Sequence, residues 1–487
     1  MGLRKLALGV SVLLCNGLLF STNPAVAQDG NLGDLRFGAA YARARGLSPD
    51  INAANATIDA AKRSYDTARA AQFPQLGVKA DYDYTHQSVD GDYFGVANLD
   101  RSDTFNRYGY GVGLTQGVYR PDLLGAVDLA RVGIDGAELA LSETEAGVAV
   151  QVAQEYLTVA DKLETLRAQY AEFFATDEQV RQIENRQRFG LVKDSDVALV
   201  RAARASAEAN KIDGENAVEA ARLKLALTVG GEFKRIGVLM GQTPLPLLNP
   251  SDLDTWIKTA LDKRAAIAAA KKGVEAALLG VDLAKGARLP KVDLVGSRVW
   301  FDADGGVSGA RTDLDERIGV EVKLPIFTSG ALSANIAKAQ SQVEIAEAKA
   351  RSTELKIKAG VQQAYMAAVS AYRQIDARKR AIEAALDAER TTRVGLDVGT
   401  ATTADWLESV RKRYGAERDY ARERLAYLLS LVQLKAAAGV LGREDMSRVE
   451  LLLKFPEPGW PAQTSFQPVG EEDTDASATA PTSGSAP

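Results

Sequence analysis

The sequence of 487 residues contains one cysteine, Cys15, and one histidine, His86. The chain therefore offers little for disulfides, for Cys-His or Ser-His catalysis, or for a metal site built on histidines. We expect no enzymatic activity, no catalytic residues, no metal and no cofactor. Its 59 Lys and Arg are outnumbered by 64 Asp and Glu. A nucleic-acid partner would call for a basic face, so this acidic balance argues against one.

Long hydrophobic runs are also scarce. The longest, residues 6–20, follows two basic residues and precedes Ala25-Val26-Ala27, the three parts of a cleavable secretory signal. A helix that spans a bilayer needs about 20 apolar residues, and no other run approaches that length. We therefore predict an exported protein from which residues 1–27 are removed, and we exclude a helical membrane protein.

What the sequence does contain is one pattern that occurs twice. Phe73-Pro74 and Leu289-Pro290 each end an Ala-rich helical stretch and begin an alternating segment, and they stand 216 residues apart. Later in each copy a glycine turn follows a very long helical pattern, at Gly190 and at Gly399, 209 residues apart. Residues 28–228 and 251–441 are thus predicted to be two structural repeats, each with a helix, a β-hairpin and long helices, joined by a linker over 229–250.

Alternating apolar and polar residues predict a β-hairpin in each repeat, over 73–120 and 289–327. In the first strand Leu76, Val78 and Tyr82 alternate with polar neighbours, and aromatic residues are concentrated around it. A soluble β-structure would alternate too, but export and the long helices favour a membrane barrel. Four strands are too few to close one, because about eight is the smallest workable number. Two, three or four chains sharing a barrel would supply 8, 12 or 16 strands.

The helical segments are much longer than a globular domain requires. No proline interrupts residues 123–188 or 331–393, so each can form a helix of about 90 to 100 Å. Apolar residues recur every seven positions in both, which is typical of coiled coils, and a four-residue jump in the first is a stutter. These seams contain Val127, Ile134, Leu141, Val148, Val152, Val159, Leu166 and Phe173 in the first repeat and Ile336, Val343, Ala350, Ile357, Ala364 and Ala371 in the second.

Residues 442–487 form a C-terminal extension after the second repeat. From about residue 458 onward the composition is dominated by Pro, Ser, Thr, Ala and acidic residues, which predicts disorder.

The order of these elements resembles that of the TolC-like outer-membrane efflux proteins. The resemblance covers roughly residues 35–441 and rests on the two Pro-opened hairpins and the two Gly turns together. It implies a mainly α protein with membrane β-structure: a homotrimer whose 12-stranded transmembrane β-barrel lies among outer-membrane lipids of a Gram-negative bacterium and continues as a periplasmic α-helical barrel.

The function that this resemblance implies is that of a passive channel-tunnel. An inner-membrane pump of the RND, ABC or MFS class and a periplasmic adaptor would deliver substrates to it, either for multidrug efflux or for type I protein secretion. The sequence distinguishes neither the cargo nor the pump class.

The resemblance also assigns roles to residues in the two Gly turns. Gly190, Leu191 and Val192, with Gly399 and Thr400, match the helix-hairpin tips at which the adaptor docks in the family. Without the resemblance, each glycine is an ordinary helix C-cap in the left-handed conformation. The two interpretations are compatible.

A gate is implied just beyond the second turn. Asp405 and Glu408 match a pair of acids at the periplasmic aperture, and they share a helix face because they stand three residues apart. A trimer would direct six carboxylates at its axis, which favours cations and should raise the pKa of at least one acid. The alternative is local: Thr402 caps the helix and Asp405 stands favourably in its first turn.

The residues that would hold this gate closed, called the lock below, depart from the family pattern. Asp196 matches a position that helps to hold the closed tip. However, Ala401 replaces the expected basic residue and Leu396 the expected tyrosine. Arg393 or Lys193 are the candidates to replace these links.

Two other classes of function remain to be weighed. An exported soluble coiled-coil scaffold or adhesin would explain the helices without a channel. A hydrolase with a carboxylate pair would need a nucleophile turn that the sequence lacks, and His86 is expected to be solvated in a loop after the first strand.

Overall fold

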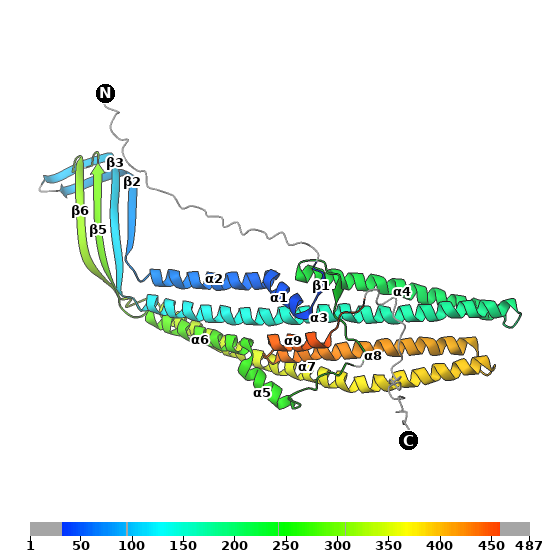
Figure 1. Cartoon of the computed structure of the whole chain (residues 1–487). Coiled ribbons are helices and arrows are strands. Elements are labelled where there is room, and N and C mark those ends of the chain that lie inside the picture. The colour runs from blue at the N-terminus through cyan, green and yellow to red at the C-terminus, as the bar shows by residue number, and fades with distance from the viewer. Residues whose placement is uncertain (1–31, 94–95, 242, 307, 458–487) are drawn as a thin grey trace, which may run out of the picture.

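The computed structural model describes residues 32–93, 96–241, 243–306 and 308–457. A four-stranded sheet stands at one end, and long antiparallel helices run from it to the opposite end of the molecule (Figure 1). The predicted signal, residues 1–27, and the C-terminal segment predicted to be disordered from about 458 lie outside the described residues. Within the described part of the chain, no helix combines the length and the apolar character that crossing a membrane requires.

The two predicted hairpins form one antiparallel sheet in the order β2-β3-β5-β6. Its strands are β2 (Gln75–Tyr93), β3 (Val96–Tyr119), β5 (Lys291–Ala303) and β6 (Arg311–Lys323). The hairpins join through β3 and β5, where Val112 pairs with Arg298. Strands β2 and β6 are left as the two open edges of the sheet.

The position expected for His86 was wrong. His86 lies inside β2 and pairs with Thr104 of β3, and its Nδ1 atom is 2.9 Å from the Thr104 hydroxyl. The strand continues well beyond the apolar alternation because cross-strand pairing persists to Tyr93. Alternation ends where one face stops being apolar, and the hydrogen-bonded ladder does not require it to continue. The side chain of His86 is exposed.

One face of the sheet is largely apolar and exposed, with the Arg298–Glu316 ion pair as an exception. Leu76, Val78, Ile318 and Val320 are between 66% and 88% exposed, although the first two lie on one edge strand and the others on the opposite edge strand. Soluble monomers rarely leave so contiguous an apolar face in water. The chain alone does not provide the cover that this face needs.

The short helices reproduce the predicted duplication. Helices α1 (Phe37–Leu47) and α5 (Leu253–Lys263) each have 11 residues, and α2 (Pro49–Ala70) and α6 (Ala265–Gly286) each have 22. Each second member begins 216 residues after the first, the separation of Pro74 and Pro290. The two-repeat layout predicted from the sequence is therefore present.

Two helices of unusual length carry the molecule away from the sheet. Helix α3 (Pro121–Arg188) has 68 residues and α7 (Ala331–Asp397) has 67, which corresponds to about 100 Å each. Pro121 occupies the start of α3, where a missing N–H group costs nothing. Each long helix turns back into a shorter partner, α4 (Asp194–Val229) or α8 (Thr403–Ala437).

The two long helices are buried to different extents. In α3 the seam residues Val148, Val152, Val159 and Leu166 are at most 5% exposed. In α7 the buried residues described are only Ala339, Val361, Ala368, Ala371 and Ile382.

A belt around the middle of the helices contains the main hydrophobic core. Here β1 (Asp34–Leu35) pairs with β4 (Arg235–Ile236), and α9 (Arg443–Leu452) packs against α1. The buried Tyr156 hydroxyl donates to the Leu35 carbonyl at 2.9 Å and accepts from the Gly237 N–H at 2.8 Å. The hydroxyl thus acts as both donor and acceptor, and the two bonds hold β1 and the linker against α3.

Candidate gate and docking tips

The two Gly turns at the far end of the helices share one backbone geometry. In the first, the Leu191 N–H donates to the Arg186 carbonyl at 3.0 Å and Gly190 has φ +71°. In the second, the Thr400 N–H donates to the Gly395 carbonyl at 2.8 Å and Gly399 has φ +79°. A bond across five residues with a left-handed glycine is a Schellman-type helix end. The predicted glycine C-caps are therefore present at both turns.

The turns also present apolar side chains to solvent. Leu191 is 72% exposed, whereas its neighbour Val192 is half-buried and packs inward. Phe189 and Val398, which directly precede the two glycines, are 79% and 69% exposed. This pair was not among the residues predicted from the sequence, although an apolar residue stands at the same place in both repeats.

Behind the turns, one hydrophobic cluster joins the two hairpins. We call it the tip cluster. Leu396 of α7 and Val192 of the first turn both pack against it, so the turns are held by a common core. Its buried members are Ile183, Val197, Val200, Trp406, Leu407, Val410 and Tyr414.

Asp405 has the local role that the alternative interpretation assigned to it. Its Oδ2 accepts from the Thr402 N–H at 3.0 Å and from the Thr402 hydroxyl at 2.6 Å, while its own N–H donates to that hydroxyl at 3.2 Å. This is a reciprocal capping box at the start of α8. The Thr402 hydroxyl and N–H bonds hold the pKa of Asp405 below its usual value. The carboxylate nevertheless remains exposed.

Glu408 lies one turn further along the same exposed face of α8. Asp405 and Glu408 are both exposed, whereas Trp406 and Leu407 between them are buried in the tip cluster. Glu408 also forms ion pairs with Arg411 at 3.3 Å and Lys412 at 3.7 Å. Because all three side chains are at least half exposed, these pairs are weak and water competes for them.

The residues expected around the lock are not brought together by direct bonds. Asp196 is half-buried on α4 and forms no ion pair among the described residues. The Arg393 guanidinium lies 5.9 Å from the Trp406 ring centroid, and Lys193 is exposed at the N-cap of α4.

An ion pair that the sequence analysis did not anticipate connects the two tips. Arg186 Nη2 at the end of α3 lies 3.1 Å from Asp397 Oδ1 at the end of α7, and both side chains are about half exposed. Because each is the last or nearly the last residue of its helix, the pair spans the gap between the two turns.

The chain matches the family described as outer membrane efflux protein over residues 40–231 and 256–440. The chain belongs to this family. As a member of the outer membrane efflux protein family it is an outer-membrane channel of transport systems, which confirms the predicted fold class, location and general function. In the described residues, no group of three or more His, Cys, Asp or Glu side chains could hold a metal ion.

Relatives and solved structures support the same outer membrane efflux protein fold. Outer membrane protein TolC of Vibrio cholerae is 27% identical, covering 85% of this chain and 93% of the relative. The proteases secretion protein PrtF of Dickeya chrysanthemi is 22% identical over 50% of this chain and 53% of its own length. The crystal structure of VceC from Vibrio cholerae aligns with a TM-score of 0.68 at 20% identity, covering 83% of this chain and 96% of VceC.

Proposed function

We propose that three copies of this chain form one conduit, in which twelve strands make a barrel in the outer membrane and the long helices continue it as a tunnel into the periplasm. The observation that carries the proposal is the sheet with its two open edge strands, β2 and β6, and its exposed apolar face. An open strand edge cannot face lipid, so β6 of one copy must pair with β2 of the next.

The helical part supports self-association independently of the sheet. Helix α7 buries few residues along its length and exposes apolar ones, including Ile345 (53%), Leu355 (66%) and Met366 (56%). Exposed apolar rows of this length are what a helix presents to neighbouring copies in a closed wall.

The assembly is tested by measuring the mass of the mature protein after extraction from membranes. We expect three chains per particle, recovered from the outer-membrane fraction and converted to single chains only by heating. A mass of two or four chains would overturn the trimer. Recovery in the soluble periplasmic fraction would instead favour the coiled-coil scaffold or adhesin.

The substrates leave this conduit passively, because an inner-membrane pump and a periplasmic adaptor supply the energy and the choice of cargo. We place the adaptor at the two tips, on Gly190, Leu191, Val192, Gly399 and Thr400. Supporting this, the exposed Phe189, Leu191 and Val398 give both tips an apolar surface suited to packing against another protein.

Docking is tested by comparing Gly399→Trp with Gly399→Ala. Both variants place a side chain on a left-handed backbone, so both carry the same kind of strain. Only tryptophan adds bulk at the tip. We expect Gly399→Trp to abolish export while the trimer stays intact, and Gly399→Ala to retain most export. Equal loss in both variants would assign the effect to the turn and not to docking.

The gate in this proposal consists of Asp405 and Glu408, with Asp196 close behind the aperture. Asp405 can act as cap and as lining residue together, because both bonds that it accepts use Oδ2 and the side chain stays exposed. The variant Asp405→Asn with Glu408→Gln should change single-channel conductance and cation block in planar bilayers by at least about two-fold.

The matched control for the gate removes two ion-paired acids from the other hairpin, Glu178→Gln with Glu208→Gln, whose side chains are 58% and 44% exposed. We expect its conductance to stay near that of the unmodified protein. If the double variant at Asp405 and Glu408 conducts as the control does, the carboxylate ring is wrong.

A further inference from the structure

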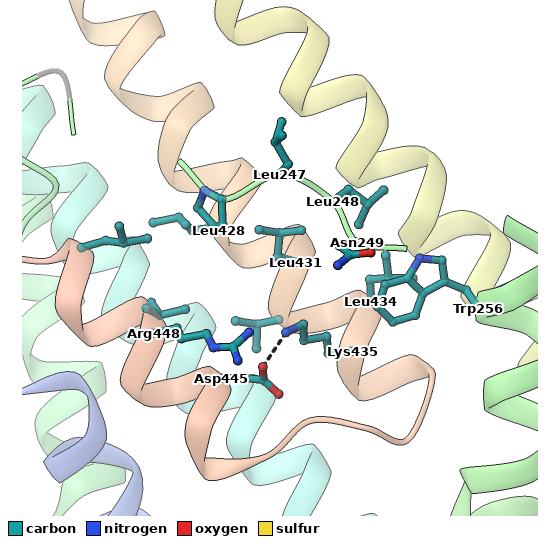
Figure 2. Close-up of a pocket in the computed structure, with 14 residues that line it drawn as sticks. Leu247, Leu248, Asn249, Trp256, Leu428, Leu431, Leu434, Lys435, Asp445 and Arg448 are labelled. Carbon is teal, nitrogen blue, oxygen red and sulfur yellow. Dashed lines mark hydrogen bonds and ion pairs between the residues drawn. The ribbon is translucent and has the colours of Figure 1, made fainter. Parts of the chain in front are cut away.

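A small pocket opens in the belt of the molecule, away from the tips and the sheet. It has a volume of about 150 Å³ and lies where the linker residues 246–249 cross α8, with α5 and α9 completing the walls (Figure 2). Its lining is mainly aliphatic and aromatic. The residues that matter here are Leu248, Trp256, Leu428, Leu431, Leu434 and Val449.

The walls of this pocket include buried side chains. Trp256 is 3% exposed and its indole N–H donates to the Pro250 carbonyl at 2.8 Å, while Leu428 and Leu434 are fully buried. A dry cavity of about 150 Å³ lined by aliphatic side chains is large enough for one benzene ring. The pocket therefore fits a single phenyl-sized group without rearrangement.

The rim of the pocket carries a net positive charge. Lys435 of α8 and Asp445 of α9 form an ion pair across it, drawn as the dashed line in Figure 2. Arg448, one turn further on α9, is exposed and forms no ion pair with any described residue. A suitable occupant thus combines one aromatic ring with nearby negative charge.

The chain itself contains such a segment directly after the described residues. Residues 458–487 contain two aromatic residues, Trp460 and Phe466, no Lys or Arg, and four acids at 471, 472, 473 and 475. Phe466 matches the pocket better than Trp460 because a phenyl ring is smaller than an indole. It also stands only five residues before Glu471, whereas Trp460 stands eleven before it.

The length of the chain allows this segment to reach the pocket. Leu452 lines the pocket, and the described chain ends five residues later at Glu457. Phe466 follows nine residues after Glu457, a span of up to about 30 Å. Such a short tether gives the phenyl ring an effective concentration on the order of millimolar at the pocket.

We propose that residues 458–475 bind back onto this pocket, with Phe466 among the leucines and the acidic run facing Arg448. The bound segment covers linker residues 246–249 and holds them against α8 and α9. The proposal does not depend on how the tips dock or gate.

Disulfide trapping tests the placement directly, because the mature chain lacks cysteine. In the full chain, Gln467→Cys with Leu431→Cys keeps Phe466 and should form a disulfide within one chain under mild oxidation. The control, Ser485→Cys with Leu431→Cys, measures random collisions of the same segment and should react at least about five-fold more slowly. Equal trapping in both pairs, or a disulfide that joins two chains, would overturn the proposal.

Labelling of the pocket gives a second readout that needs no disulfide. A maleimide should react with Leu431→Cys about five- to ten-fold faster when the chain ends at Glu457, or when Phe466→Ala is added, because an unoccupied pocket is open to the reagent. The variant Trp460→Ala should label at the slow rate. Equal rates in the full and shortened chains would show that the segment does not occupy the pocket.

Discussion

The two helical hairpins contain the same ion pair in very different surroundings. In the α3–α4 hairpin, Arg204 pairs with Glu208 at 3.3 Å, and the side chains are 37% and 44% exposed. In the α7–α8 hairpin, at the repeat distance of 209 residues, Arg413 pairs with Glu417 at 3.0 Å, and the side chains are 15% and 2% exposed. The duplicated sequence specifies the pair, and the place of each helix in the bundle decides its burial.

The difference arises because α8 packs against both α7 and α3, whereas α4 lies mainly on α3 (Figure 1). Arg413 additionally binds Glu389 of α7 at 3.0 Å. Glu417 Oε2 is buried and has no hydrogen-bond partner among the described residues. Burial therefore raises the pKa of Glu417 to about 7, against the pull of Arg413. The equivalent of the solvent-accessible pair Arg204–Glu208 is thus a buried pair, Arg413–Glu417, whose acid titrates near neutral pH.

The largest effect expected from this contrast follows the loss of the arginine. At pH 8, Arg413→Ala removes the cation that favours the Glu417 carboxylate, so the buried acid must either stay charged without a partner or bind a proton, and we expect the free energy of unfolding to fall by about 4 kcal/mol. Arg204→Ala should cost far less, because water solvates Glu208. Urea unfolding of both variants, followed by circular dichroism, measures the difference. Similar losses in the two variants would mean that burial does not distinguish the pairs.

The pH dependence of stability provides the next test. Between about pH 4.5 and 7 folded Glu417 retains a proton that the unfolded chain has released, so the stability of the fold should decrease as the pH rises across this interval. Glu417→Gln cannot lose that proton and should flatten the decrease, by about 3 kcal/mol in all. Glu208→Gln is the matched change on the exposed pair. If the two variants give the same pH profile, Glu417 is not the group responsible.

Most of the fold could be predicted from the sequence because it rests on periodicities. The proline landmarks Pro74 and Pro290 and the seven-residue seams depend on local pattern, and both the hairpins and the long helices formed where these patterns stand. His86 was misplaced because the strand continues as a polar ladder beyond the apolar alternation. Residues that pair across two strands, as His86 does with Thr104, leave no such local pattern in the sequence.

The candidate site was predictable only in part, for the same physical reason. The cap of α8 was visible because Thr402 and Asp405 are three residues apart, a local spacing. The pair of Arg186 and Asp397 was not, because 211 residues separate its members and only the packing of the tip cluster brings the helix ends together. The burial of Glu417 likewise depends on which helices surround α8.

The smallest effect concerns the caps that distinguish the two turns. Thr402 caps α8, whereas the equivalent residue 209 positions earlier is Lys193, whose side chain makes no cap bond. Lys193→Thr should build the same capping box with Asp196 and stabilise α4 by about 1 kcal/mol, and Thr402→Ala should destabilise α8 by a similar amount. Thermal unfolding of the two variants compares these effects. No gain from Lys193→Thr would show that the half-buried Asp196 is held away from the cap, as a residue with another role at the tip would be.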